Sequence, residues 1–217
     1  LEKRTRITTA QERRSIAYHE AGHASISWLL EYANPLVKVT IVPRGKALGA
    51  AWYLPEERQI TTREQLLDEM CATLGGRAAE EIFLGAISTG ASNDLERVTK
   101  QAYTMVTYFG MSDQLPNLNY YDSTGQEWGF TKPYSEETAR LIDKEVQKII
   151  NEQYDRARTI LRDNAAKHNQ LAEKLLECEV IYSEDLEKIF GKRPWASRSE
   201  EIMEQQAADA STTAPHA

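Results

Sequence analysis

Two histidines and a glutamate lie close together near the start of the chain, in a segment that is otherwise apolar. His19 and His23 are four positions apart, and Glu20 directly follows the first of them. Because an α-helix turns by about 100° per residue, residues four positions apart lie on one face, and two imidazoles placed in this way can bind the same metal ion. The glutamate would lie beside this pair, close enough to reach a water molecule on the metal without binding the metal itself.

The chemistry that this His-Glu-x-x-His spacing indicates is the hydrolysis of peptide bonds by a zinc metallopeptidase. Zinc lowers the pKa of a bound water molecule to about 7 and polarises the scissile carbonyl group, while a carboxylate takes the water's proton and passes it to the leaving amine. The alternative is that the three residues are ordinary members of a helix, since so short a pattern also occurs by chance. Their apolar setting favours the interpretation as a metal site, because two imidazoles and a carboxylate are costly to bury without partners.

A catalytic zinc ion normally has three protein ligands, so a third is needed. The remaining histidines, His168 and His216, fall in a predicted helical hairpin and in the C-terminal tail, and neither is well placed. Carboxylates are therefore the candidates: Glu80 and Glu81 on one predicted helix, and Asp94 in the first turn of the next. The simpler interpretation of Glu80 and Glu81 is that they lie on a solvated helix face or hold a histidine ring through a hydrogen bond. The simpler interpretation of Asp94 is an acid that is stabilised by the helix dipole. The residues alone leave this choice open.

The histidine pair lies on the first predicted helix, which spans residues 11–31 and ends before Pro35, a residue that cannot continue it. Residues 37–42 then alternate between apolar and polar side chains. After a break at residues 43–45, the segment 48–54 is rich in residues that suit a strand. We therefore expect a small β-hairpin or sheet directly after the first long helix.

Helices dominate the rest of the predicted fold, which is therefore mainly α. Thr61 and Glu64 form a capping box that would begin a helix running to Gly85. This helix contains Gly75 and Gly76, and because each glycine costs about 1 kcal/mol of helix stability relative to alanine, we expect another element to pack very closely there. Further helices are predicted at residues 92–109, 135–164, 171–176 and 183–190, and a long irregular loop at residues 112–133.

The composition is that of a globular protein and excludes several classes of protein. Of the 217 residues, 41% are hydrophobic and 27% are charged, which is enough for one sizeable core or at most two small ones. The net charge of −7, without a dense basic stripe, argues against nucleic acid as a partner. No apolar run is long enough to cross a membrane. Cys71 and Cys178 have neither disulfide nor metal-binding spacing, and we expect both in the core.

Four motifs occur in order along the chain. They are His19-Glu-Ala-Gly-His23, Val39-Thr-Ile-Val-Pro-Arg-Gly45, Gly75-Gly-Arg-Ala-Ala-Glu-Glu81 and Ser88-Thr-Gly-Ala-Ser-Asn-Asp94. In this order and at these separations they resemble the peptidase domain of the FtsH family of membrane-anchored, ATP-dependent zinc proteases. The resemblance runs from about Thr8 to Phe190, and four motifs in register make chance an implausible explanation.

The resemblance implies a complete site and a role for each residue in it. One zinc ion per chain would be bound by His19, His23 and Asp94, with Glu20 as the catalytic base and later the acid. Glu80 would lie near the metal without binding it. The implied fold is a helical zinc metallopeptidase domain at residues 10–191. Residues 1–9 would be a linker from an ATPase module, and the polar residues 192–217 a disordered tail.

The resemblance also implies the surroundings of such a domain. Proteins of this family carry transmembrane helices and an ATPase module, form hexameric rings, and degrade unfolded or translocated chains in protein quality control. This chain has no phosphate-binding loop for ATP, so ATP would act only in a module outside it, and membrane attachment would also come from outside it. We expect a bacterial inner membrane with the peptidase on the cytoplasmic side, or alternatively an organellar membrane.

An unfolded substrate is most simply bound through its backbone, by pairing with the exposed edge of a sheet. Either residues 37–43 or residues 48–54 could offer that edge, although both strands could equally be paired within the core. The loop at 112–133 could cover the site or have no catalytic role. A different class of function, a helical oligomerisation module with a structural or degenerate metal site, is disfavoured by Glu20 and by a set of three rather than four ligands.

Overall fold

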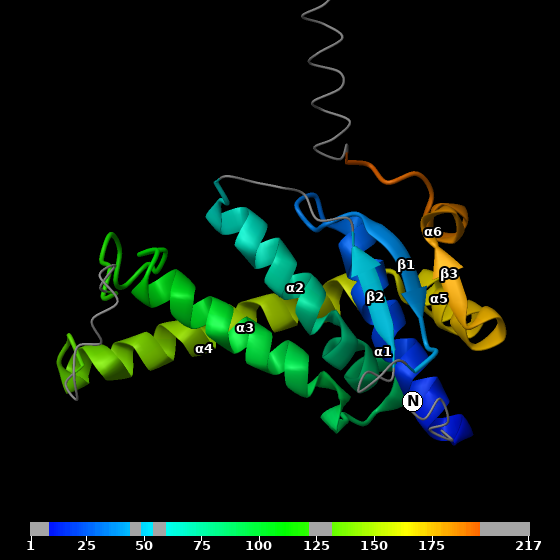
Figure 1. The fold of residues 1–217 in the computed structure, drawn as a ribbon, viewed down its shortest axis with the longest axis horizontal. Helices are drawn as coiled ribbons and strands as arrows, with labels where there is room; N and C mark the ends of the chain where they lie inside the picture. Colours follow the sequence, from blue (N-terminus) through cyan, green and yellow to red (C-terminus); the bar gives the residue numbers. More distant parts are fainter. Residues whose placement is uncertain (1–8, 44–48, 54–59, 122–131, 196–217) are drawn as a thin grey trace, which may run out of the picture.

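The structure of the protein is a computed structural model that describes residues 9–43, 49–53, 60–121 and 132–195 (Figure 1). The helices are α1 (Ala10–Leu29), α2 (Arg63–Ala79), α3 (Ser92–Thr107), α4 (Glu136–Asp163), α5 (Ala165–Cys178) and α6 (Ser183–Phe190). The strands are β1 (Leu36–Thr40), β2 (Ala50–Tyr53) and β3 (Val180–Tyr182). The predicted fold class, mainly α with a small sheet after the first long helix, is confirmed.

Some predictions fall on segments that the structure does not describe. The linker before residue 9, the turn at 44–48, the middle of the loop at 122–131 and the tail from residue 196 lie outside the described residues. Among the helices that are described, none combines the length and the apolar character needed to cross a membrane.

α1 is the central helix of the fold, and its middle is buried on every side. It begins with a capping box in which the Thr9 hydroxyl accepts from the Glu12 backbone N–H at 3.2 Å and the Glu12 carboxylate accepts from the Thr9 backbone N–H at 2.7 Å. Every residue from Ala17 to Trp28 is buried. A helix without an exposed face must pack against several elements, and α1 contacts α2, α5 and the sheet. The polar residues at its centre are therefore held in the interior.

The three strands form an antiparallel sheet in the order β2-β1-β3, packed against α1 (Figure 1). Val39, at the centre of β1, is fully buried and pairs with Ala51 on β2 and with Ile181 on β3. β3, which comes from the C-terminal part of the chain, was not predicted. Because β1 is paired on both edges, the prediction that residues 37–43 could receive an extended peptide is wrong. β2 has no second neighbour among the described strands.

α2 crosses α1 at a point where neither helix has a side chain. A Cβ atom at Gly22 would lie 2.3 Å from the backbone oxygen of Gly75, and one at Gly75 would lie 2.8 Å from the backbone oxygen of Gly22. Both separations are well below the normal contact distance of about 3.5–4.0 Å. Only glycine at both positions allows the helices to approach this closely, and the close packing predicted at the Gly75-Gly76 pair is confirmed.

The chain leaves α2 through a short π-helix, Glu80–Leu84, which ends at Gly85 with a left-handed φ of 68°. A π-helix fits one more residue into a turn than an α-helix and is frequent at functional sites. In this segment Glu80 is buried and contacts α1, whereas Glu81 accepts a hydrogen bond from Arg158 on α4 at 3.1 Å. The two neighbouring acids therefore have different partners.

α3 and α4 extend side by side away from the sheet and pack against α2 (Figure 1). We call their shared core the aliphatic layer, and its buried side chains are Met70, Leu74, Val98, Ala102, Met105, Val106, Leu115, Ile142, Val146 and Ile149. On α3 and α4 these residues recur at intervals of three or four, as expected for amphipathic helices. Because Asp94 lies in the first turn of α3, the aliphatic layer fixes its position relative to α2.

The C-terminal end of α1 is covered by residues that follow α6. Arg193 donates from Nη2 to the backbone oxygens of Leu30 at 3.0 Å and Ala33 at 2.7 Å, and the Trp28 indole donates to the backbone oxygen of Gly191 at 3.1 Å. The last carbonyl groups of a helix have no partners within the helix, and Leu30 is the C-cap of α1. Arg193 therefore caps α1 at Leu30 and holds the segment that follows it at Ala33. The chain therefore contacts the domain beyond residue 191, where composition alone places the start of the tail.

Two local predictions are wrong. α2 is capped by Thr62, whose hydroxyl accepts from the Gln65 backbone N–H, rather than by Thr61 with Glu64. Cys178 is exposed rather than buried, because it lies in the last turn of α5. Cys71 is buried as predicted, and both cysteines are free thiols.

Candidate metal centre

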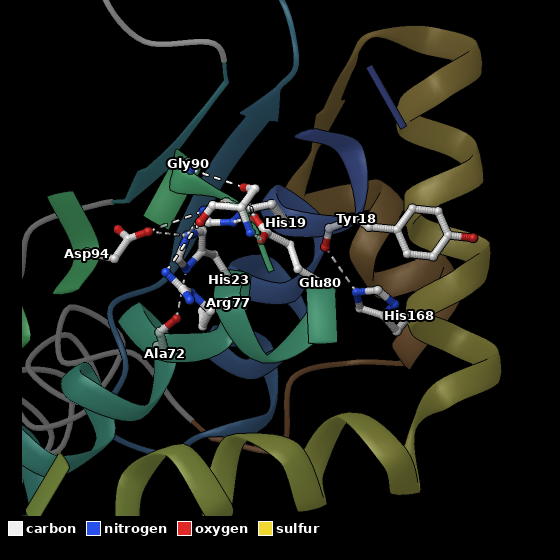
Figure 2. Close-up of polar contacts among 10 residues, drawn as sticks. Tyr18, His19, His23, Ala72, Arg77, Glu80, Gly90, Asp94 and His168 are labelled. Carbon is white, nitrogen blue, oxygen red and sulfur yellow. Dashed lines mark hydrogen bonds and ion pairs between the residues drawn. The ribbon is translucent and has the colours of Figure 1, made fainter. Parts of the chain in front are cut away.

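Asp94, at the start of α3, faces two histidine rings on α1 (Figure 2). Its Oδ2 atom lies 3.2 Å from Nε2 of His19 and 3.4 Å from Nε2 of His23, and the two Nε2 atoms are 3.0 Å apart. The histidines are buried, whereas the Asp94 side chain is 24% exposed, so the group opens to solvent on the aspartate side. Within the part of the chain that the structure describes, this is the one histidine, cysteine or acidic cluster able to hold a metal ion.

The spacing of the three atoms fits a zinc ion. Ligand atoms at zinc bond lengths of about 2.0–2.2 Å and tetrahedral angles are separated by roughly 3.3–3.5 Å. The observed separations of 3.0, 3.2 and 3.4 Å come close to this value. Three protein ligands also leave a fourth tetrahedral position for water or substrate, as in catalytic rather than structural zinc sites.

The other nitrogen of each histidine ring has a partner, which directs both Nε2 atoms toward Asp94. Nδ1 of His19 donates to Oε1 of Glu80 at 2.7 Å, and Nδ1 of His23 donates to the backbone oxygen of Ala72 at 2.9 Å. Because an ionised carboxylate and a carbonyl oxygen can only accept, the hydrogen of each neutral ring is on Nδ1 and the lone pair is on Nε2. Metal-binding histidines are oriented by contacts of this kind.

The electrostatics of the group call for a cation. Burial by itself would lower the pKa of His19, but hydrogen bonds to Asp94 and Glu80 outweigh burial and raise that pKa to about 9. Burial would likewise raise the pKa of Asp94, yet its contacts with His19 and His23 hold that pKa well below its usual range. The three acceptor atoms therefore bind a positive charge strongly, and a divalent metal ion can take the place of a proton there.

Glu80 links the His19 ring to the loop that leads to Asp94. Its Oε2 atom accepts from the backbone N–H of Ser88 at 2.6 Å, and its Oε1 atom accepts from the Ser88 hydroxyl at 3.0 Å. Burial opposes ionisation of Glu80, but the hydrogen bonds from His19 and Ser88 outweigh it and lower its pKa. Glu80 contacts Nδ1 of the ring and Asp94 faces Nε2, so Glu80 lies outside the three-residue group (Figure 2).

Glu20 lies next to the three-residue group without being part of it. Its side chain is buried, and its pKa is raised by that burial, an effect that the nearby His23 and His19 oppose only in part. A carboxyl group with a raised pKa binds a proton more readily than an exposed one. This property suits a residue that accepts a proton in one step and donates it in the next.

Gly76 leaves room for the His19 ring. A Cβ atom at this position would lie 2.5 Å from both Cε1 and Nε2 of His19. Any side chain would therefore displace the ring nitrogen that faces Asp94. The two neighbouring glycines of α2 thus have separate roles, since Gly75 allows the helices to cross and Gly76 accommodates the imidazole.

His168 lies away from the group, on α5. It is fully buried and stacks on Phe83 with the ring centroids 4.2 Å apart. Its Nε2 atom donates to the backbone oxygen of Tyr18 at 3.3 Å (Figure 2). Burial lowers its pKa to about 4, so the ring is neutral at physiological pH. The remaining histidine, His216, lies outside the described residues.

Two partners of the site were not predicted from the sequence. Ser88 belongs to the motif that ends at Asp94, but nothing in its type or spacing indicates that it holds Glu80. Ala72 contributes only its backbone oxygen, for which a sequence contains no signal. Of the other acidic candidates, Glu81 lies against Tyr154 and Arg158 on α4 instead of the histidines.

Comparison with known proteins points to one family. A family model described as Peptidase family M41 matches residues 6–189. The ATP-dependent zinc metalloprotease FtsH of Parabacteroides distasonis is 81% identical over 206 residues, which are 95% of this chain and 30% of that protein. FtsH of Karelsulcia muelleri is 54% identical over 191 residues, which are 88% of this chain and 31% of that protein.

A eukaryotic relative is more distant. The mouse mitochondrial inner membrane m-AAA protease component AFG3L2 is 46% identical over 206 residues, which are 94% of this chain and 26% of that protein. The chain therefore spans less than a third of the length of these curated relatives.

Proposed function

The chain belongs to peptidase family M41, and we propose that it is a zinc-dependent endopeptidase domain that hydrolyses peptide bonds of unfolded protein chains. The observation that carries the proposal is the convergence of His19, His23 and Asp94, with Glu20 beside them. The names of the relatives, which describe ATP-dependent zinc metalloproteases, support the same metal and the same reaction.

Each side chain has one task in the proposed mechanism. His19, His23 and Asp94 would hold one zinc ion per chain, and the contacts at Nδ1 of the two rings keep the rings in place. The chemistry that zinc would supply there is that of a Lewis acid, which lowers the pKa of water to about 7 and polarises the scissile carbonyl group. The Glu20 carboxylate accepts a proton from the attacking water and then donates it to the nitrogen of the leaving amine, so that the cleaved product departs as a neutral amine.

The substrate is proposed to bind as an extended chain along β2. This strand has one edge without a neighbour among the described strands, whereas β1 is paired on both sides. Pairing through the backbone tolerates almost any side chain, as a protease of unfolded proteins requires.

We further propose that the complete protein adds an ATPase module and membrane segments to this domain, and that it assembles as a homo-hexamer into which polypeptides are threaded. The relatives are named as ATP-dependent or as a component of an inner-membrane protease, and the matched residues make up only 30%, 31% and 26% of their lengths. The higher identity to bacterial FtsH than to the mouse protein favours a bacterial inner membrane, with the peptidase on its cytoplasmic side, over an organelle.

The experiment that tests the proposed function compares wild type with Glu20→Gln in the cleavage of a flexible protein such as casein. Glu20→Gln keeps the shape of the side chain but cannot accept the proton, so we expect cleavage to fall by about 10²–10⁴-fold, with zinc retained. The matched control is Glu152→Gln on the exposed face of α4, which should cleave like wild type.

Equal cleavage by wild type and Glu20→Gln would overturn the proposal. It would favour the alternative, a helical oligomerisation module with a structural or degenerate metal site. The three-ligand group already argues against that alternative, because structural zinc sites almost always have four protein ligands.

A further inference from the structure

We propose that Gly49 is a positioning residue for the catalytic base. Its lack of a side chain provides the space in which the Glu20 carboxylate lies, next to the start of the edge strand β2. The inference rests on the proposed function, in which Glu20 moves the proton. It concerns a residue outside the metal-binding motif and far from it in sequence.

The contact between Gly49 and Glu20 is too close for any other residue. A Cβ atom at Gly49 would lie 2.7 Å from Oε1 of Glu20, 2.8 Å from its Cγ and 2.9 Å from Cγ2 of Ile16. Carbon atoms in normal contact are about 3.5–4.0 Å apart. Because the first two of these contacts are with the Glu20 side chain, a methyl group at position 49 would push the carboxylate out of its present place.

The backbone gives no reason for a glycine at this position. Gly85, Gly110 and Gly191 have φ values of 68°, 58° and 89°, where side chains are disfavoured, but Gly49 does not adopt this left-handed conformation. Alanine would therefore fit the local backbone of Gly49. The requirement for glycine comes from what lies opposite, which is the Glu20 carboxylate together with Ile16.

The position of Gly49 along the sheet links the base to the proposed substrate edge. Ala51 on β2 packs into the core beside α1, and residues two positions apart on an extended chain face the same side. Gly49 thus faces α1 at the point where β2 begins. A peptide that pairs with β2 would pass close to Gly49. The residue that positions Glu20 would therefore also lie beside the bound substrate.

The first arm of the test measures cleavage of a flexible peptide by Gly49→Ala, with zinc content determined on the same samples. We expect kcat to fall by about 10–100-fold, KM to stay within about twofold, and zinc per chain to match wild type. The matched control is Ala166→Ser at an exposed position of α5, which takes part in neither the candidate metal centre nor the proposed substrate strand and should keep the wild-type kcat. A role of Gly49 in folding alone would not lower kcat selectively.

The second arm does not depend on activity. Gly49→Ala is introduced into wild type and into a Glu20→Ala variant, and the midpoint of thermal unfolding is measured for all four chains. In wild type, overpacking should lower the midpoint by about 3–9 °C. In the Glu20→Ala background the shift should be no more than about half as large, because the group that the new methyl meets has been removed.

The outcomes separate this inference from the proposed function. A wild-type kcat in Gly49→Ala, or the same shift of the midpoint in both backgrounds, would overturn the inference while wild type still cleaves and Glu20→Gln does not. A wild type that cleaves no better than Glu20→Gln would overturn the proposed function, and with it a catalytic role for the position of Glu20.

Discussion

α2 packs against its two neighbours in opposite ways. Where it crosses α1, backbone meets backbone at Gly22 and Gly75, and the space beside the crossing holds polar side chains. Where it packs against α3 and α4, the contact is the aliphatic layer, in which side chains such as Met105 and Ile149 interdigitate. One helix thus has a tight polar contact on one side and a conventional apolar contact on the other.

This difference explains where the site lies. Large apolar side chains keep two helices well separated and tolerate small changes of shape. The three atoms that face one another at the candidate metal centre come from α1 and α3, and their orienting contacts come from α2 and the segment after it. Such a group needs helices at a fixed and short separation, which glycines provide. The aliphatic layer holds α3 against α2, and so brings Asp94 to the crossing.

The largest effect is expected from adding a methyl group at the crossing. In Gly22→Ala the new Cβ would lie 2.3 Å from the Gly75 backbone oxygen, so α1 and α2 must separate. We expect the free energy of unfolding to fall by about 3 kcal/mol, the upper end of the usual cost of overpacking, and zinc content to fall well below that of wild type. Urea unfolding and elemental analysis measure the two effects.

The matched change in the aliphatic layer removes a methyl group from a buried helical position. Ala102→Gly on α3 should cost about 1 kcal/mol, mainly through helix propensity, and leave zinc content as in wild type. If Ala102→Gly lost as much zinc as Gly22→Ala, the contrast between the two contacts would be wrong.

A second effect is expected from the residue that orients His19. In wild type, the His19 ring and the Ser88 backbone N–H contact different oxygens of Glu80. Glu80→Gln keeps the size of the side chain but leaves only one acceptor oxygen for these two donors. We expect zinc affinity to fall by about 10–100-fold, measured by competition with a chromogenic chelator. Unchanged affinity would mean that Glu80 does not position the ring.

A third effect distinguishes a buried histidine outside the candidate metal centre from those inside it. The pKa of His168 is about 4 in the folded protein and about 6.5 in an unfolded chain. The neutral ring therefore stabilises the fold fully above about pH 6.5, and this contribution is lost as the pH falls toward 4. Between pH 7 and pH 5 the loss should be about 2 kcal/mol.

Comparison of urea unfolding of wild type and His168→Gln at these two pH values isolates this contribution, because other groups titrate alike in both. The variant should lose about 2 kcal/mol less stability than wild type between pH 7 and pH 5. An identical pH dependence in the two proteins would contradict the lowered pKa, because it would mean that His168 takes up a proton in the folded protein as readily as in the unfolded chain.

The smallest effect is expected deep in the aliphatic layer. Ile149→Val removes one buried methyl group and should lower the free energy of unfolding by about 1 kcal/mol. Zinc content and the cleavage of casein should match wild type, because the layer adapts to small changes. A loss of zinc in this variant would mean that the metal centre depends on the layer as strictly as on the glycine crossing.

The parts of the fold that depend on local patterns were predictable from the sequence. The long helices follow from the spacing of apolar residues, and the close packing at Gly75-Gly76 follows from the cost of two glycines inside a helix. The third strand, β3, was missed because it has only three residues and pairs with a strand far away in the chain. The cap of α2 was misplaced by one residue because Thr61 and Thr62 both begin a plausible capping box.

The site was predictable to a different degree at each residue. The spacing of His19 and His23 on a helix brings two rings together without knowledge of the fold. The approach of Asp94 depends on how α3 packs, so residue types alone left it level with Glu80 and Glu81, and only the resemblance to a family singled it out. The roles of the Ala72 backbone oxygen and of Gly49 depend on contacts between distant segments, which no local pattern encodes.

The central claim, that His19, His23 and Asp94 together bind one zinc ion, is tested most directly by the zinc content per chain of purified wild type and Asp94→Ala, with Asp163→Ala as the control at an exposed position. We predict about one zinc ion per chain in wild type and in the control, and close to none in Asp94→Ala. A wild type without zinc after purification in the absence of chelators, or an Asp94→Ala variant that retains a full complement, would contradict the account.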